Sequence, residues 1–357
     1  MAVKPFKLAL AGFSAVGLAA LAACGEAPSE NGGDDNADAS FTACMVTDSG
    51  GVDDKSFNES SWAGMEDAAA ENDDIKVEYK ESASETDYDP NLQDAVADGC
   101  NFIVGVGGLM TANVEAIAEA NPDIPFATVD GLSAIPNVTS IQFDTAQSAF
   151  LAGYVAAAQT TTGTVATWGG MQIPPVTIFM DGFAEGIEKH NADKGTDVQL
   201  LGWDAEAQSG TFLNSFEDTA AGKSTSDTFI QQGADIIFPV AGPAGIGALT
   251  AAAEDDAVNA MWVDTDGYES TEYGAEIITS AEKALDVAVK DAVLAAYDGT
   301  TGGSYVGTLA NEGVALSPFH DFEDAVSDET KAEIEALTEQ IIDGTLVVES
   351  QSSPAPE

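Results

Sequence analysis

The chain has 357 residues, which is enough for two domains of ordinary size, and its 61 acidic residues against 11 basic ones give a net charge of −50 at pH 7. It contains no arginine. Because phosphates and carboxylates are usually held by guanidinium groups, this composition argues against nucleotides, sugar phosphates and nucleic acids as partners, although lysine or backbone N–H groups can bind a single phosphate.

Residues 1–23 have the pattern of a bacterial lipoprotein signal peptide. Lys4 and Lys7 precede the apolar run 8–20, and small residues precede Cys24, as they do at a lipoprotein processing site. An uncleaved anchor is the alternative, but the run is shorter than the roughly 20 residues that span a bilayer. We therefore expect a lipid on Cys24 and an acidic, disordered tether at 24–40 that holds the protein at the extracytoplasmic face of the cell membrane.

From residue 41 onward, short apolar runs alternate with helical patterns, which predicts parallel strands joined by crossover helices. A first lobe is predicted to have strands at 41–47, 76–81, 102–106, 126–129 and 138–143, and helices at 60–71, 91–98 and 111–121. A second series has expected strands at 165–168, 198–203, 235–240 and 260–263, and helices at 146–159, 176–190, 218–232 and 245–254. The rest predicts a helix at 281–297, two short strands within 306–348, a helix at 329–342 and a mobile polar tail at 350–357.

The stretch 48–62 reads Asp-Ser-Gly-Gly-Val-Asp-Asp-Lys-Ser-Phe-Asn-Glu-Ser-Ser-Trp and joins the first expected strand to the first expected helix. In an open α/β sheet such a turn lies at the carboxyl end of the strand, where ligands bind, and the helix start offers unpaired backbone N–H groups. The turn presents a carboxylate, a hydroxyl, an aromatic ring and an amide, which suit a flat, polar, uncharged ligand: Asp48, Ser56, Phe57 and Asn58. The alternative is an ordinary loop in which Asp54 or Ser56 caps the helix.

Other polar groups also follow expected strands. Asp130 closes the strand 126–129 at the same sheet edge as Asp48, where it is either a ligand contact or a turn residue. Asp264 ends the strand 260–263 and Lys283 opens the next helix, so this acceptor and this donor can together hold hydroxyl groups.

Two glycine segments also lie at strand ends. Gly242 lies in a loop where either the backbone meets a ligand or the chain only turns. The segment 105–110 is similar to a dinucleotide-binding loop, but Met110 replaces its third glycine, so we favour close backbone approach to a ligand and expect no cofactor.

Cysteine and histidine spacing gives no sign of a metal site. Cys44 and Cys100 remain after processing, and both a disulfide and two buried thiols are consistent with their positions. With only two histidines, His190 and His320, no zinc spacing and no nucleophile elbow, an enzyme is also disfavoured.

The run 46–58, followed by Trp62-Ala-Gly64, resembles the opening signature of the basic membrane protein (BMP, PnrA-like) family of substrate-binding lipoproteins. Similar segments follow in order over roughly residues 41–348: 105–107, 121–130, 137–138, 149–153, 182–186, 233–235, 240–245 and 278–280 with Lys283. The resemblance implies a type I periplasmic-binding-protein fold, an α/β fold in which two Rossmann-like lobes with parallel sheets are joined by hinge crossings. It also implies that lobe 1 comprises 41–144 plus about 277–303, and lobe 2 comprises 145–276 plus about 304–349.

The resemblance further implies roles for single residues. Phe57 and an aromatic of the second lobe stack on a base; Phe216 is the candidate and Phe212 the rival. Asp130 bonds the base, the Gly242 backbone meets the ribose, and Asp264 with Lys283 holds the ribose hydroxyls. The family tends to read Asp-x-Asp-Gln where this chain reads Asp264-Thr-Asp-Gly267, so either Asp264 or Asp266 can face the ligand.

The predicted function is therefore that of a monomeric, lipid-anchored substrate-binding protein that captures a nucleoside, with purines favoured, and delivers it to an ABC permease. The alternative is a sensory or other small-molecule-binding lipoprotein for a neutral or cationic ligand that is not coupled to transport.

Overall fold

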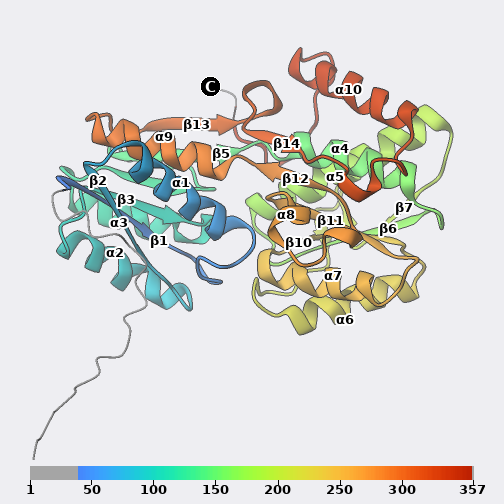
Figure 1. Cartoon of the computed structure of the whole chain (residues 1–357), viewed down its shortest axis with the longest axis horizontal. Coiled ribbons are helices and arrows are strands. Elements are labelled where there is room, and N and C mark those ends of the chain that lie inside the picture. The colour runs from blue at the N-terminus through green and yellow to red at the C-terminus, as the bar shows by residue number, and fades with distance from the viewer. Residues whose placement is uncertain (1–38, 356–357) are drawn as a thin grey trace, which may run out of the picture. The chain divides into compact units, whose positions relative to one another are not determined.

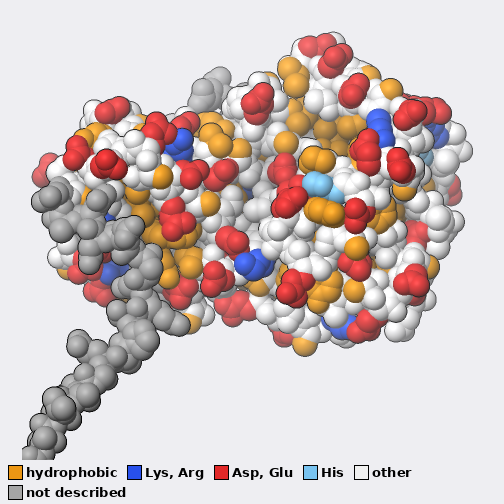
Figure 2. All heavy atoms as spheres, in the orientation of Figure 1, with side chains coloured by type: hydrophobic (Ala, Val, Ile, Leu, Met, Phe, Trp, Pro, Cys, Tyr) orange, Lys and Arg blue, Asp and Glu red, His pale blue; other side chains and the backbone are white. Residues whose placement is uncertain are grey.

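The structure is a computed structural model and describes residues 39–355 (Figure 1). The expected signal peptide, Cys24 and nearly all of the expected tether lie outside the described residues. Two six-stranded sheets, each with its own helices, and a short two-stranded ribbon make up the described part of the chain. Acidic side chains are spread over the face shown in Figure 2, with few lysines among them.

The first lobe is built on a parallel sheet with the strand order β13-β5-β4-β3-β1-β2. Its strands are β1 (Phe41–Val46), β2 (Ile75–Lys80), β3 (Phe102–Val106), β4 (Phe126–Val129), β5 (Val138–Phe143) and β13 (Gly303–Gly307). Its helices are α1 (Phe57–Glu71), α2 (Tyr88–Ala97), α3 (Thr111–Ala120) and α9 (Leu285–Tyr297), with 3₁₀ turns η1 (Glu85–Asp87) and η2 (Gly108–Met110). Every residue of β3 and β4 is buried, as expected for central strands covered on both faces.

The second lobe is built on a sheet with the order β14-β12-β11-β10-β6-β7, in which β14 alone runs antiparallel to its neighbour. Its strands are β6 (Thr164–Gly169), β7 (Gln199–Leu201), β10 (Ile236–Val240), β11 (Asn259–Asp264), β12 (Ile277–Lys283) and β14 (Val314–Leu316), beside the ribbon of β8 (Trp203–Asp204) and β9 (Ser209–Gly210). Its helices are α4 (Ala146–Gln159), α5 (Pro174–Lys194), α6 (Thr219–Gln231), α7 (Ile246–Ala253), α8 (Gly267–Ser270) and α10 (Asp328–Ile342), with 3₁₀ turns η3 (Gly242–Gly245), η4 (Gly274–Glu276), η5 (Leu309–Asn311) and η6 (His320–Phe322). Two α/β lobes with mainly parallel sheets confirm the predicted fold class.

Two lobe boundaries differ from the expected ones. β12 was expected in the first lobe, but it pairs with β11 and β14 of the second sheet, and β13 pairs with β5 of the first sheet instead of joining the second lobe. The chain therefore crosses between the lobes near Asp144, near Ala284 and near Thr308. The reason is that 277–283 is an almost fully buried strand that continues the second sheet, although its sequence leads directly into a helix.

Helices α4 and α5 pack against each other through glycines. A Cβ atom on Gly153 would lie 2.1 Å from the carbonyl oxygen of Phe183, and one on Gly186 would lie 2.0 Å from that of Phe150. Only glycine permits backbones to approach so closely. The contact fixes α5, whose first turn, with Pro174 at its start, lies at the carboxyl edge of the second sheet.

Covalent and polar contacts tie down two further segments. Cys44 of β1 and Cys100, which precedes β3, form a disulfide. The C-terminal segment, expected to be a mobile tail, is instead packed: Ser350 donates a hydrogen bond to Asp181 (2.6 Å) and Ser353 donates one to Asp144 (2.9 Å). The tail contacts the buried Asp181 and the half-buried Asp144, which lie on distant parts of the chain, and its local composition does not reveal these contacts.

Candidate functional site

A cavity with an empty volume of about 600 Å³ lies at the carboxyl ends of strands from both sheets. Of the predicted ligand residues, all except Ser56 and Asn58 line it: Asp48, Phe57, Asp130, Phe216, Gly242, Asp264 and Lys283. The backbone at Gly107 and Gly108, also expected to approach a ligand, lies in its wall.

The carboxylate of Asp54 shapes the turn between β1 and α1. It accepts hydrogen bonds from the backbone N–H groups of Ser56 (3.0 Å), Asn58 (2.9 Å) and Glu59 (3.0 Å), which the first turn of a helix leaves unpaired. Asp54 is therefore the helix cap that the ordinary-loop reading expected, and it also lines the cavity. A helix cap and a place in the cavity wall are therefore compatible here, because the cap holds Phe57 at the cavity wall.

Asn58 does not face the cavity, in contrast to the predicted contact with a ligand. Its side chain is fully buried, and its Nδ2 donates to Asp48 Oδ1 (2.8 Å) and to Asp54 Oδ2 (3.2 Å). The amide thus holds two cavity carboxylates in place. The amide lies behind these carboxylates because α1 begins at Phe57, which turns the next residue towards the lobe interior.

Lys283 is the basic residue that lines the cavity, and it is buried. Its ammonium group lies 2.6 Å from Asp130 Oδ2, of the first lobe, and 3.4 Å from Asp264 Oδ1, of the second. Both aspartates end a strand in the left-handed conformation, with φ of 59° and 70°, which aspartate tolerates better than most residues. The two carboxylates therefore reach the same ammonium group from opposite lobes.

The lobes also meet through direct hydrogen bonds beside the cavity. Ser56 Oγ of the first lobe donates to Asp264 Oδ2 of the second at 2.7 Å, and both groups are buried. Thr265 Oγ1 donates to the backbone oxygen of Lys55 at 3.2 Å. Ser56 therefore contacts the opposite lobe in this closed arrangement, instead of lining the cavity as predicted.

The charges in the cavity do not balance if every group is ionised, because four carboxylates face one ammonium group. Burial and, to a smaller extent, the neighbouring aspartates raise the pKa of Asp48 to about 8, against the lowering effect of the hydrogen bond from Asn58. Burial also raises the pKa of Asp54 to about 6. The pKa of Asp130 is raised by burial against the attraction of Lys283, whereas Asp130 and Asp264 outweigh burial and raise the pKa of Lys283. The cavity therefore offers a lysine, carboxylates and protonated carboxyl groups as hydrogen-bonding partners.

Aromatic rings from both lobes form the apolar walls. The Lys283 ammonium lies 5.0 Å from the centre of the Phe57 ring and 5.2 Å from that of Phe179. Phe216 lines the cavity, and it fits because Gly170 has no side chain: a Cβ there would lie 2.4 Å from the ring. The rival Phe212 instead packs edge-on against Trp203, with ring centres 5.9 Å apart, and does not line the cavity.

The start of α5 supplies lining residues that the sequence reading missed: Ile173, Pro175, Val176 and Phe179. A signal was present, because a proline at the first helical position after a strand marks a helix start at the ligand-binding edge.

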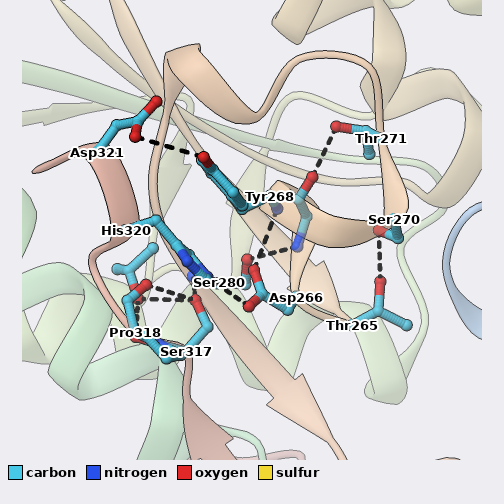
Figure 3. Close-up of polar contacts among 12 residues, drawn as sticks. Thr265, Asp266, Tyr268, Ser270, Thr271, Ser280, Ser317, Pro318, His320 and Asp321 are labelled. Carbon is cyan, nitrogen blue, oxygen red and sulfur yellow. Dashed lines mark hydrogen bonds and ion pairs between the residues drawn. The ribbon is translucent and has the colours of Figure 1, made fainter.

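Of the two candidate aspartates after β11, Asp264 lines the cavity and Asp266 does not. Asp266 caps α8 by accepting from the backbone N–H of Tyr268 (3.1 Å), and its other oxygen lies 2.6 Å from His320 Nε2 (Figure 3). The Tyr268 and His320 rings stack with centres 4.1 Å apart, and the Tyr268 hydroxyl donates to Asp321. These contacts hold Asp266 away from the cavity.

A sequence model described as "ABC transporter substrate-binding protein PnrA-like" matches residues 41–352. The chain belongs to this family. Over 98% of its length it is 32% identical to a CD4+ T-cell-stimulating antigen of Listeria innocua and 30% identical to an ABC transporter nucleoside-binding protein, BmpA, of Lactococcus lactis, covering 99% and 100% of those proteins. The crystal structure of an ABC transporter solute-binding protein from Aeropyrum pernix matches with a TM-score of 0.78 and 26% identity, covering 87% of this chain and 94% of that one.

Membership of the PnrA-like family confirms the predicted family and makes the protein a substrate-binding protein of an ABC transporter. The family is one of solute-binding proteins and not of enzymes. Within residues 39–355, no helix is both long and apolar enough to cross a membrane. In the same part of the chain, no group of three or more histidine, cysteine or acidic side chains is placed to hold a metal ion.

Proposed function

We propose that this PnrA-like protein captures a nucleoside, with purines favoured, in the cavity between its lobes and delivers it to an ABC permease. The observation that carries the proposal is the combination of aromatic rings from both lobes in the cavity wall with a buried Lys283 bridged to Asp130 and Asp264. Flat heterocycles stack on aromatic rings, and ribose hydroxyls pair with carboxylates and ammonium groups. The Lactococcus lactis relative named as a nucleoside-binding protein supports the same ligand class.

The cavity suggests a place for each part of the ligand. Phe57 and Phe216 hold the base between them, while Asp48 and Asp130 bond its edge. Asp264 and Lys283 hold the ribose hydroxyls. The backbone at Gly242 lies against the sugar, because no other atom lies within 4 Å of where a Cβ on Gly242 would be. Ser56 and Asn58 act through Asp264 and Asp48 in this arrangement.

The rest of the proposal concerns the cellular setting. A lipid on Cys24 would anchor a monomeric protein at the extracytoplasmic face of the membrane, close to the permease. An uncharacterized lipoprotein of Pyrococcus horikoshii, 30% identical over 75% of this chain, supports this setting. Mass spectrometry of the membrane fraction would detect the acylated N-terminal peptide, and a soluble, unmodified protein would contradict the anchor.

Calorimetry with adenosine, inosine, guanosine, cytidine and uridine, beside AMP, sugars and amino acids, tests the ligand class. We expect nucleosides to bind and AMP to bind much more weakly, because the carboxylates in the cavity repel a phosphate and arginine is absent from the chain. AMP binding as tight as that of adenosine would contradict the proposal.

Ligand capture should also close the lobes, because the cavity takes its walls from both of them. Small-angle scattering is expected to show a smaller radius of gyration at saturating nucleoside. An unchanged radius would mean that the ligand binds one lobe alone.

The alternative ligand class is a cation, which the surplus of carboxylates in the cavity favours. Under this alternative the protein is a sensory or other lipoprotein that is not coupled to transport. Tight binding of amines or basic amino acids in the same screen, with no nucleoside binding, would support it.

A further inference from the structure

A second cavity adjoins the proposed nucleoside cavity and shares four wall residues with it: Asp48, Ser49, Leu109 and Phe216. Its empty volume is about 620 Å³. The rest of its wall comes from both lobes, namely from 83–88 around η1 and from 171 and 214–217. Two cavities that share walls on this scale can be occupied by one ligand.

The shared walls show which end of the ligand would face the second cavity. Asp48 and Phe216, assigned above to the base, line both cavities. Asp264 and Lys283, assigned to the ribose, line the first cavity and not the second. A group that extends from the base therefore reaches the second cavity, whereas one that extends from the ribose does not.

The side chains that line the second cavity suit a hydrogen-bond donor or a cation. The Tyr88 side chain is 2% exposed, and its hydroxyl, which forms no hydrogen bond within the described part of the chain, is not sealed in the interior, as its place in the cavity wall requires. Burial raises the pKa of Tyr88, as do the nearby carboxylates of Asp48, Glu85 and Glu217, so the hydroxyl stays neutral. No lysine lines this cavity, and Leu109 and Phe216 offer apolar surface for methylene groups.

Resting on the proposed function, we propose that the second cavity is a subsite for a positively charged or hydrogen-bond-donating substituent on the base. The protein would then bind base-substituted nucleosides, with the carboxylates of Glu85 and Glu217 facing the substituent and the unpaired Tyr88 hydroxyl accepting a hydrogen bond from it. Because the two glutamates come from opposite lobes, such a substituent would gain contacts from both when the lobes close.

The test compares substituents of similar length that are neutral, positively charged or negatively charged. The exocyclic amine of adenosine, guanosine or cytidine, whichever parent the wild-type protein binds most tightly, carries a propyl, a 2-aminoethyl or a 2-carboxyethyl group. Calorimetry should show the aminoethyl nucleoside binding about tenfold more tightly than the carboxyethyl one. The ammonium group forms a partly exposed ion pair with the glutamates, whereas the carboxylate is repelled by them. The difference should shrink in roughly 1 M salt, which screens such pairs.

The double variant Glu85→Gln/Glu217→Gln should reduce the ratio of the two affinities to about two or three, because the ratio depends on the carboxylates. Its matched control is Glu119→Gln/Glu335→Gln, which removes the same charge from exposed positions on α3 and α10 and should leave the ratio unchanged. Tyr88→Phe should weaken binding of the aminoethyl nucleoside more than that of the propyl one.

Different failures have different meanings. If none of the parent nucleosides binds, the proposed function fails and the subsite falls with it. If the parent binds but all three substituted nucleosides are rejected, the nucleoside site stands and the subsite is wrong. Equal affinities for the aminoethyl and carboxyethyl nucleosides would show that the second cavity is only an opening to solvent, which also overturns the subsite.

Discussion

Replacing Lys283 with methionine should weaken nucleoside binding strongly, and more so at high pH. The substitution keeps a chain of similar length but removes the ammonium group that lies 2.6 Å from Asp130 and 3.4 Å from Asp264. In the variant, closing the lobes would bury the carboxylates of Asp130 and Asp264 with no cation beside them. The closed form of the variant must therefore hold one more protonated carboxyl group than the closed wild type.

The free energy of protonating that carboxyl group sets the expected loss of binding free energy. A solvated aspartate has a pKa of 3.8, so protonating it costs about 4 kcal/mol at pH 7 and about 2 kcal/mol at pH 5. The pKa of this carboxyl group is higher in the closed form than in the open form, so closing the lobes takes up a proton. Closure of the variant is therefore favoured at low pH and is lost as the pH rises. At 1.4 kcal/mol per tenfold, we expect the dissociation constant of Lys283→Met to exceed that of the wild type by about 1,000-fold at pH 7 and by about 20-fold at pH 5.

Calorimetry at both pH values, with the nucleoside that the wild-type protein binds most tightly, measures this difference. The control is Lys290→Met, which removes a lysine from an exposed pair with Glu71 at 2.6 Å and should change affinity at neither pH. A Lys283→Met variant that binds within threefold of the wild type at pH 7 would refute the reasoning. A loss of equal size at both pH values would show that Lys283 acts through shape or a direct bond and not through the buried charges.

Three further predictions test single contacts. Phe57→Ala should weaken binding by about 1–3 kcal/mol for every base, as measured by calorimetry beside the ligand-free melting temperature, whereas Phe212→Leu, outside the cavity, should leave affinity unchanged. The double variant Cys44→Ser/Cys100→Ser should lose about 2–4 kcal/mol of unfolding free energy, measured in urea, because the disulfide closes a loop with a sequence separation of 56. A wild-type protein that is equally stable with and without reductant would contradict this prediction. Burial, with Asp266 and Asp286, raises the pKa of Glu282 to about 7, so the melting temperature should fall as the pH rises from about 6 to about 8. If the melting temperature of Glu282→Gln falls with pH as steeply as that of the wild type, Glu282 does not cause the fall.

The sequence by itself determined the fold class, the family and most of the candidate site. Alternating strands and helices place the ends of parallel strands at one edge, so Asp48, Asp130 and Asp264 could be grouped without coordinates. Local rules also narrowed the helix cap to Asp54 or Ser56, since capping depends on residues a few positions apart, and the structure shows that Asp54 takes this role. The glycines of α4 and α5 were visible as a family pattern, although their packing role was not.

Only the tertiary structure decided which groups meet across the cavity. Nothing near Asn58 in sequence shows that its amide holds Asp48 and Asp54, and nothing near Ser56 shows that its hydroxyl reaches Asp264. Asp266 does not share the role of Asp264 because its carboxylate pairs with His320, which lies 54 residues further along the chain. The lobe to which β12 belongs was likewise open, since strand pairing depends on partners distant in sequence. Side-chain orientation and pairing are set by long-range packing, and a local pattern of residue types does not contain that information.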